Sequence, residues 1–274
     1  MTTTVNAGNA SFGGQQPFAL IAGPCVLEDA ETTFRIADFL KNLTTELGID
    51  FVFKASYDKA NRTSVTSYRG PGLDAGLELL AQVKQKFAVP VVSDVHDVTQ
   101  VSAAAQVLDI LQIPAFLCRQ TDLLVAAGNT GKVVNVKKGQ FQAPWDMRHV
   151  VGKITSTGNN QVILTERGTT FGYNNLVVDM RSLIIMRELN YPVIFDATHA
   201  VQLPGGADGA SAGQREYVAS LSRAAVATGV DGLFLEVHED PECARCDGPN
   251  SLYLKDLRSL LTPLLALDAV VKKL

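Results

Sequence analysis

The sequence predicts a (β/α)8 barrel in a single domain, and two observations support this prediction. Eight short, mostly apolar segments alternate with eight longer amphipathic segments along nearly the whole chain. Short apolar runs are typical of strands that are buried on both faces, as in a parallel sheet covered by helices. The length of 274 residues is also right for eight such units around one core.

The expected strands and helices follow each other in strict order. Asp29 and Asp97 are placed to cap the first and third helices, and Gly48 and Gly229 to end the first and seventh. The strands are expected at Phe18–Ala22, Phe51–Lys54, Val91–Asp94, Ile110–Ile113, Val133–Lys137, Val162–Glu166, Val193–Asp196 and Gly232–Glu236. The helices are expected near 29–47, 73–87, 97–108, 120–129, 145–156, 177–189, 214–228 and 254–272.

The alternative fold is a doubly wound open sheet with two additional units. Such sheets often begin with a G-x-G-x-x-G turn, and the first turn here reads Ala22-Gly23-Pro24-Cys25 instead. No linker or repeat divides the chain. We therefore expect one catalytic domain over residues 1–274, with residues 1–16 as a short polar N-terminal extension.

Composition and charge narrow the classes of partner. A net charge of −4 gives no general attraction to nucleic acid or to an anionic membrane. No apolar run approaches the roughly 18 residues of a membrane span, and residues 1–16 lack the features of a signal peptide. We therefore expect a cytoplasmic protein that binds neither nucleic acid nor membrane. Its cysteines should be thiols or metal ligands rather than disulfides.

Ionisable residues stand at most of the expected strand ends. In a barrel, the carboxyl ends of the strands build the functional face, so these side chains should meet in one charged pocket. They are Cys25, Lys54, Asp94 with His96, Lys137, Glu166 with Arg167, Asp196 with His199, and Glu236.

One subset of these residues has the character of a metal site. It offers one thiolate, one imidazole and two carboxylates, a mixture that suits Zn²⁺, Fe²⁺, Co²⁺ or Mn²⁺ better than Mg²⁺ or Ca²⁺. The alternative is a buried cysteine, a loop histidine and two solvated acids. Cys243 and Cys246 form a lone C-x-x-C without a second pair, which we expect to be incidental. The expected ligands are Cys25, His199, Glu236 and Asp247.

A second subset is cationic. Several buried lysines and arginines in an acidic protein require an anion to neutralise them, and phosphate and carboxylate groups fit that need. Lys138 and Arg69, by contrast, are expected on solvated loops, and Gln202–Gly213 as a mobile lid. Phe141 and Trp145 either wall the pocket or pack under a loop. The cationic residues are Lys54, Lys59, Arg62, Lys137 and Arg167.

Seven motifs together resemble one enzyme family from about residue 18 to residue 270. They are I-A-G-P-C (21–25), F-K-A-S-Y-D-K-A-N-R-T-S (53–64), Q-I-P-A-F-L-C-R-Q-T-D (112–122), N-V-K-K-G-Q-F (135–141), T-E-R-G-T-T-F-G-Y-N-N-L (165–176), D-A-T-H-A-V-Q-L-P-G-G (196–206) and C-D-G-P-N (246–250). The family is 3-deoxy-D-manno-octulosonate 8-phosphate synthase, also called 2-dehydro-3-deoxyphosphooctonate aldolase. The resemblance implies a barrel enzyme, usually a homotetramer, that condenses phosphoenolpyruvate with D-arabinose 5-phosphate and water for lipopolysaccharide biosynthesis.

The resemblance also implies roles for single residues. Cys rather than Asn at position 25 goes with the metal-dependent class of the family, whose ligands correspond to the four residues named above. The residues implied to bind substrate are Lys54, Ser56, Lys59, Asn61, Arg62, Thr63, Asp94, Gln112, Lys137, Gln140 and Arg167. The residues implied to act in catalysis are His199, Lys137, Arg167 and Asp247. Thr63 replaces the usual Ser and keeps the hydroxyl.

Three alternative functions stay open. The related 3-deoxy-D-arabino-heptulosonate 7-phosphate synthases share the barrel and the metal ligands, but their loop reads K-P-R-T-S where this chain has K-A-N-R-T-S. Asn61 therefore favours the five-carbon acceptor over erythrose 4-phosphate. A metal-dependent class II aldolase usually binds its metal through several histidines, and this chain has only four in all, which disfavours that class. A non-catalytic metal or phosphometabolite sensor would lack a catalytic residue or carry an added domain, and neither is found.

Overall fold

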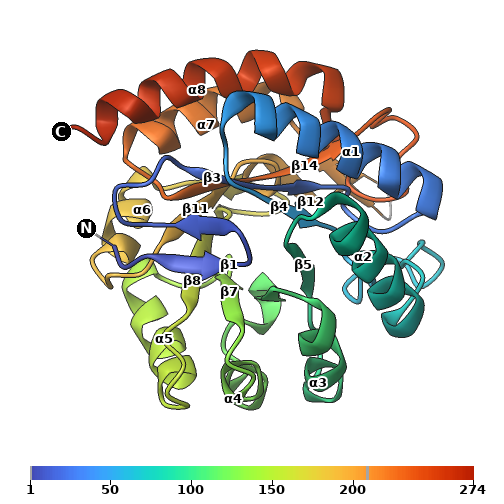
Figure 1. The fold of residues 1–274 in the computed structure, drawn as a ribbon, viewed down its shortest axis with the longest axis horizontal. Coiled ribbons are helices and arrows are strands. Elements are labelled where there is room, and N and C mark those ends of the chain that lie inside the picture. The colour runs from blue at the N-terminus through green and yellow to red at the C-terminus, as the bar shows by residue number, and fades with distance from the viewer. Residues whose placement is uncertain (1, 208–209) are drawn as a thin grey trace.

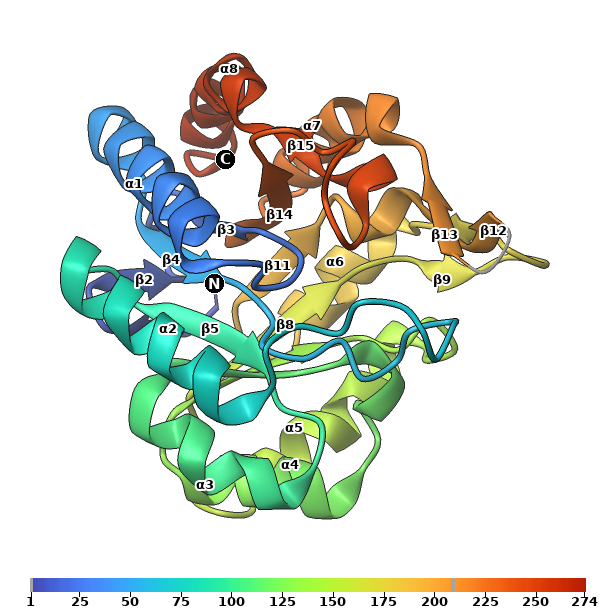
Figure 2. The same ribbon diagram turned by 90° about the vertical axis from the view of Figure 1, so that its right-hand side faces the viewer.

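The computed structural model describes residues 2–207 and 210–274, and their strands form a closed parallel barrel (Figures 1 and 2). Closure is direct, because β11 pairs with β14 at Phe195 and Leu233, and β14 pairs with β3 at Leu235 and Ala22. The barrel strands are β3 (Ala19–Gly23), β4 (Phe51–Lys54), β5 (Val91–Asp94), β6 (Ile110–Ile113), β7 (Val133–Lys137), β8 (Val162–Glu166), β11 (Val193–Asp196) and β14 (Gly232–His238). The predicted fold class is confirmed, and the open sheet is excluded.

Eight α-helices of the described chain surround the strands (Figure 1). The predicted caps are confirmed: Asp29 accepts a hydrogen bond from the backbone of Thr32, and Asp97 accepts one from Thr99. Gly48 and Gly229 follow their helices at positive φ, as expected of glycine stops. The helices are α1 (Ala30–Leu47), α2 (Leu73–Phe87), α3 (Val98–Val107), α4 (Thr121–Asn129), α5 (Met147–Thr155), α6 (Met180–Arg187), α7 (Val218–Ala227) and α8 (Leu257–Val271).

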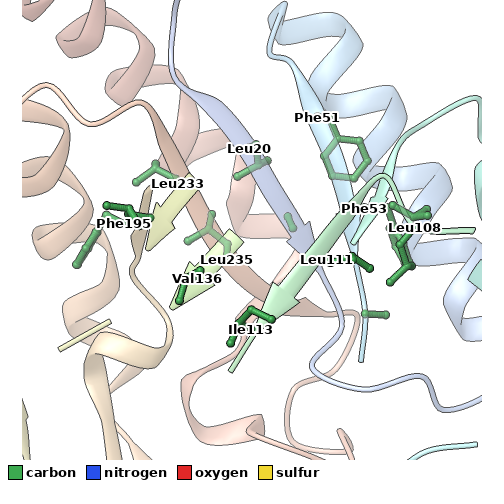
Figure 3. Packing of buried hydrophobic residues seen from close by; sticks show 14 of the residues in the cluster. Leu20, Phe51, Phe53, Leu108, Leu111, Ile113, Val136, Phe195, Leu233 and Leu235 are labelled. Carbon is green, nitrogen blue, oxygen red and sulfur yellow. The ribbon is translucent and has the colours of Figure 1, made fainter. Parts of the chain in front are cut away.

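The strand side chains alternate between two hydrophobic clusters, as the period of two along a strand requires. One set, including Leu20, Leu233 and Leu235, packs outward against the helices (Figure 3). The other set, including Ile21 and Phe234, points into the barrel. Because both faces are buried, the strands are mostly apolar, which is why the sequence showed short apolar runs.

The N-terminal extension is more ordered than the sequence analysis implied. It forms a hairpin of β1 (Val5–Ala7) and β2 (Ala10–Phe12), which lies across one end of the barrel (Figure 1). Its apolar side chains, such as Phe12, join the interior cluster with the first residues of several barrel strands. The hairpin therefore closes the amino ends of the strands and leaves only the carboxyl ends for a site.

Shorter elements follow the carboxyl ends of the strands. The hairpin of β12 (Gln202–Ala207) and β13 (Ala210–Gly213) and the short strands β9 (Thr169–Thr170) and β10 (Leu176–Val177) lie on one side of the molecule (Figure 2). The last, β15 (Leu252–Tyr253), extends the pairing of β14. Residues 208 and 209 of the expected lid lie outside the described residues. Among the helices described, none is long and apolar enough to cross a membrane.

Candidate active site

A polar pocket of about 200 Å³ opens where the carboxyl ends of the barrel strands meet. The loop between β4 and α2, the ends of β5, β7 and β8, and the β12–β13 hairpin all contribute to its wall. Both charge signs are present in the lining, which is the character that the strand ends predicted. The predicted residues that line it are Lys59, Asn61, Arg62, Thr63, Asp94, Lys137, Gln140, Arg167, His199 and Asp247.

Three predicted substrate residues lie beneath the pocket instead of lining it. Ser56 donates to one oxygen of Asp94 at 2.6 Å, and Gln112 donates to the other at 2.7 Å. Both carboxylate oxygens are therefore fixed by neighbouring strands. Burial alone would raise the pKa of Asp94, but Lys59, Lys54 and Lys137 hold it well below its usual value. Asp94 is thus an ordered anion among cations.

Lys54, the third buried residue, pairs with the carboxylate at the end of β14. Its Nζ lies 2.5 Å from Glu236 Oε1 and 2.8 Å from the carbonyl oxygen of Cys25. Lys59 approaches the same carboxylate oxygen at 3.6 Å. Although burial opposes ionisation, His199 and the two lysines hold the pKa of Glu236 well below its usual value. Glu236 is therefore a carboxylate at the barrel centre.

The four predicted metal ligands fall into two groups that share Asp247, one with Cys25 and Cys246 and the other with His199 and Glu236. Cys25 Sγ lies 3.3 Å from Asp247 Oδ2, and His199 Nε2 lies 3.7 Å from the same oxygen. His199 Nε2 also lies 3.6 Å from Glu236 Oε1. Ligand bonds of about 2.0–2.3 Å in tetrahedral zinc sites place donor atoms roughly 3.3–3.8 Å apart, so each of these three pairs is at ligand spacing.

Two further observations support that fit. Glu236 Oε2 is buried and accepts no hydrogen bond from any residue that the structure describes, so one carboxylate oxygen is free for a cation. Burial, together with Cys246 and Asp247 beside it, raises the pKa of the Cys25 thiol well above its usual value. A divalent cation reverses this effect, because metal binding deprotonates a thiol. The donor set is suited to a metal in chemistry as well as in spacing.

Asp196 is a buried residue of this site that the sequence analysis left without a role. Its Oδ2 lies 2.8 Å from His199 Nδ1 and 2.6 Å from Lys137 Nζ. A carboxylate on Nδ1 fixes the imidazole and leaves Nε2 facing the other ligands, as in many metal sites. Its position at a strand end, three residues before His199, was the available signal.

Lys137 and Arg167 are buried, and the effect of burial on their pKa outweighs that of the acids beside them. Lys137 Nζ lies 3.8 Å from the ring centroid of Phe234, and burial lowers the pKa of Lys137. Arg167 donates to Gln202 at 3.0 Å, and burial lowers its pKa too. Arg167 Nη1 is buried without a partner among the described residues. A buried guanidinium nitrogen without an acceptor is costly, which indicates an anion-binding position.

A hydrogen bond joins the loop between β4 and α2 to the loop that follows β14. Arg62, between β4 and α2, donates to Cys246 Sγ at 2.6 Å. Cys246, which we expected to be incidental, has a buried thiol that lies in one group with Cys25 and Asp247. Cys243, the other cysteine of the motif, is exposed and donates to Asp240.

Two secondary expectations also need correction. Lys138 was expected on a solvated loop, but it is fully buried, with Nζ 3.5 Å from Glu166 Oε1 and hydrogen bonds to backbone carbonyls. Phe141 and Trp145 are more than half exposed and do not line the pocket, whereas Phe116 does. Arg69 is exposed, as expected, and it pairs with Asp58.

Comparisons with known proteins agree with this geometry. A family model described as the DAHP synthetase I family matches residues 2–273. A 2-dehydro-3-deoxyphosphooctonate aldolase of Citrifermentans bemidjiense is 64% identical over 273 residues, covering 100% of both chains. Proteins of the same name from Syntrophotalea carbinolica (65%, covering 99% of this chain and 98% of the relative) and Geobacter sulfurreducens (63%, covering 99% and 100%) are also similar. The chain belongs to the DAHP synthetase I family.

Proposed function

We propose that the chain condenses phosphoenolpyruvate with D-arabinose 5-phosphate and water. The products are 3-deoxy-D-manno-octulosonate 8-phosphate and phosphate, and the reaction serves lipopolysaccharide biosynthesis. The relatives' shared name supports the reaction, and their identity of 63–65% over nearly full length supports its transfer to this chain. The observation that carries the proposal is the buried, partnerless Arg167 Nη1 beside Lys137, at a pocket bounded by a metal donor set.

Phosphoenolpyruvate is the anion that this pocket would hold. Lys137, Arg167 and Gln140 line the wall formed by the ends of β7 and β8. Phosphate and carboxylate on one small molecule would neutralise Lys137, Arg167 and Lys59 together. In this proposal Lys54, Ser56 and Gln112 lie beneath the substrate and support the site indirectly. Lys54 pairs with Glu236, and Ser56 and Gln112 donate hydrogen bonds to Asp94.

The pentose phosphate would bind at the loop between β4 and α2. Asn61, Arg62 and Thr63 offer an amide, a guanidinium and a hydroxyl at the pocket rim. Arg62 Nε is buried without a described acceptor, so a phosphate there would satisfy it. The two phosphates then occupy opposite walls, which leaves the reacting carbons of the two substrates between them.

A divalent cation would be held by Cys25, His199, Glu236 and Asp247, with Zn²⁺, Fe²⁺, Mn²⁺ and Co²⁺ as candidates. When bound, it would supply Lewis acidity for the acceptor carbonyl or the attacking water. The cation is part of the proposal because the donor spacing, the free Glu236 Oε2 and the mixed ligand chemistry all fit it.

The chain's own residues would align the reaction. C3 of phosphoenolpyruvate attacks the aldehyde carbon of the pentose, and water adds to C2. Loss of phosphate by C–O cleavage then gives the keto acid. Lys137 and Arg167 would hold the phosphate and carboxylate, which fixes the face of the enol and lowers the entropic cost of attack. Asp196 would keep His199 oriented through the 2.8 Å contact at Nδ1.

Two competing functions are less well supported. The family description also covers heptulosonate-forming enzymes, but K-A-N-R-T-S and the relatives' name favour the five-carbon acceptor. A sensor without catalysis would not need the full set of donors and cations found around this pocket.

The proposal includes a cytoplasmic homotetramer. Free thiols at all four cysteines suit a reducing compartment. Several aromatic side chains near the pocket side are exposed, which is typical of a surface that another subunit covers. They are Phe116, Phe141, Trp145, Phe171 and Tyr173.

A phosphate-release assay tests the proposal directly. We expect turnover with phosphoenolpyruvate and arabinose 5-phosphate, and much slower turnover with erythrose 4-phosphate. EDTA or dipicolinate should abolish turnover, and Zn²⁺, Mn²⁺ or Co²⁺ should restore it. Preference for erythrose 4-phosphate would reassign the acceptor, and full activity in metal-free protein would remove the cation from the proposal.

A further inference from the structure

Cys246 lies at the metal-donor cluster, although the four predicted ligands do not include it. Its side chain is buried, and its Sγ, Cys25 Sγ and an Asp247 oxygen all lie within 4.8 Å of one another. A second donor group, formed by His199, Glu236 and Asp247, shares Asp247 with the first. Asp247 therefore links the two sulfur atoms to the group that contains the imidazole and the second carboxylate.

A tight turn brings Cys246 and Asp247 to the cluster together. Asp247 has a left-handed backbone with φ of 50°, a conformation that Asp tolerates better than most residues. At Gly248, a Cβ atom would lie 2.3 Å from the carbonyl oxygen of Pro241, so only glycine fits. Side chains of successive residues usually diverge, and this turn lets the sulfur and the carboxylate converge.

The other cysteine of the C-x-x-C provides an internal comparison. Cys243 is exposed, and its thiol donates to Asp240 Oδ2 at 3.2 Å, away from the cluster. The pair is therefore not a two-sulfur clip. Of the two cysteines, only Cys246 is grouped with Cys25, which follows β3, the strand that pairs with β14.

The contact from Arg62 is an independent observation. Arg62 Nη1 donates to Cys246 Sγ at 2.6 Å. Cationic N–H donors on a sulfur are the contacts that stabilise an electron-rich metal thiolate and orient it. The same arginine lies on the loop proposed to bind the pentose phosphate, so the sulfur stands between the metal donors and the acceptor loop.

We propose that Cys246 is a second sulfur ligand of the divalent cation, in addition to Cys25. This inference rests on the metal dependence proposed above. A donor set with two thiolates is softer than one with a single thiolate, and it favours Zn²⁺ and Cd²⁺ over Mn²⁺. Through the sulfur, Arg62 links the cation to the acceptor loop.

Zinc X-ray absorption on the full-length, zinc-loaded protein counts the sulfur ligands without reference to activity. We expect two sulfur scatterers at about 2.3 Å in the wild type. Cys246→Ser and Cys25→Ser should each show one. Cys243→Ser is the matched control, because it removes the exposed cysteine of the same motif, and it should still show two.

A single sulfur scatterer in the wild-type spectrum would overturn the proposal. This measurement is made on the wild-type protein, so it does not depend on the folding of any variant. Chelator-sensitive condensation alongside one sulfur would leave the proposed function intact and restrict Cys246 to holding Arg62. Competition between Cd²⁺ and Mn²⁺ provides a second measurement. Cys246→Ser should lose preference for Cd²⁺, and an unchanged preference in a folded variant would also contradict the proposal.

Discussion

A buried carboxylate has a raised pKa at one end of the barrel and a lowered pKa at the other end. At the amino end, burial raises the pKa of Asp268 on α8, which accepts a hydrogen bond from the backbone of Phe18. At the carboxyl end, Glu236 is more deeply buried, yet cations hold its pKa well below the usual value. The surrounding charges therefore decide the sign of the shift, and burial alone does not.

The difference shows how one set of strands serves two purposes. The amino ends are covered by the β1–β2 hairpin, so their side chains contribute apolar contacts and stability. The carboxyl ends carry buried cations and carboxylates, whose desolvation is costly unless partners or ligands compensate. We therefore expect substitutions at the amino end to change stability, and substitutions at the carboxyl end to change binding and turnover.

The largest effect should come from Cys25→Ala at the carboxyl end. Loss of a proposed ligand should lower metal affinity by more than about a hundredfold, because even changes in the outer shell cost 10–100-fold. Most phosphate release should be lost with the metal. Metal content by elemental analysis and turnover provide the measurements, with Cys243→Ala as the control. Metal content equal to the wild type would remove Cys25 from the site.

The next largest effect should come from Phe12→Ala at the amino end. Phe12 is fully buried among the interior residues, so truncation should lower the free energy of unfolding by about 3–5 kcal/mol. The KM for each substrate should stay unchanged, because the pocket lies at the other end of the strands. Denaturant unfolding and steady-state kinetics measure the two quantities. A raised KM in a variant of normal stability would show that the two ends are coupled.

Arg62→Ala should have a smaller and more selective effect. Loss of the guanidinium should weaken arabinose 5-phosphate binding by about 2 kcal/mol, or roughly thirtyfold in KM. The KM for phosphoenolpyruvate should change much less, because Lys137 and Arg167 lie on another wall. Arg69→Ala is the matched control, since Arg69 is exposed on the same loop and pairs with Asp58. The reverse ranking of the two KM changes would reassign the loop.

Features that a local sequence pattern encodes, such as strands and the residues at their ends, could be predicted from the sequence. Apolar runs located all eight barrel strands to within two residues. Strand-end chemistry pointed to Cys25, His199 and Glu236, and the acid-rich loop after the last strand pointed to Asp247. The contacts of Asp196 and Lys138 could not be predicted, because they depend on which neighbouring side chains face each other after closure. The position of Cys246 beside Cys25 could not be predicted from the spacing of the motif, because it depends on the turn at Asp247 and Gly248.

Asp268→Asn should have the smallest effect, and its sign depends on pH. The pKa of Asp268 is raised in the folded state, so the folded protein binds this proton more tightly than the unfolded chain. Its contribution to stability is therefore greatest below the unfolded pKa, near 3.9, and is lost as pH rises through the folded pKa. The asparagine variant lacks this loss and can still accept the hydrogen bond from Phe18.

The difference in free energy of unfolding should accordingly shift in favour of the variant as pH rises from about 4 towards neutrality. Urea unfolding at several pH values measures it, with Asp38→Asn, an exposed acid on α1, as the control. The opposite shift would mean that Lys272 and Arg187, which favour the charged form, outweigh burial at this position. In that case nearby charges would outweigh burial in setting the pKa of a carboxylate at both ends of the barrel. The two ends would then differ only in the size of the pKa shift.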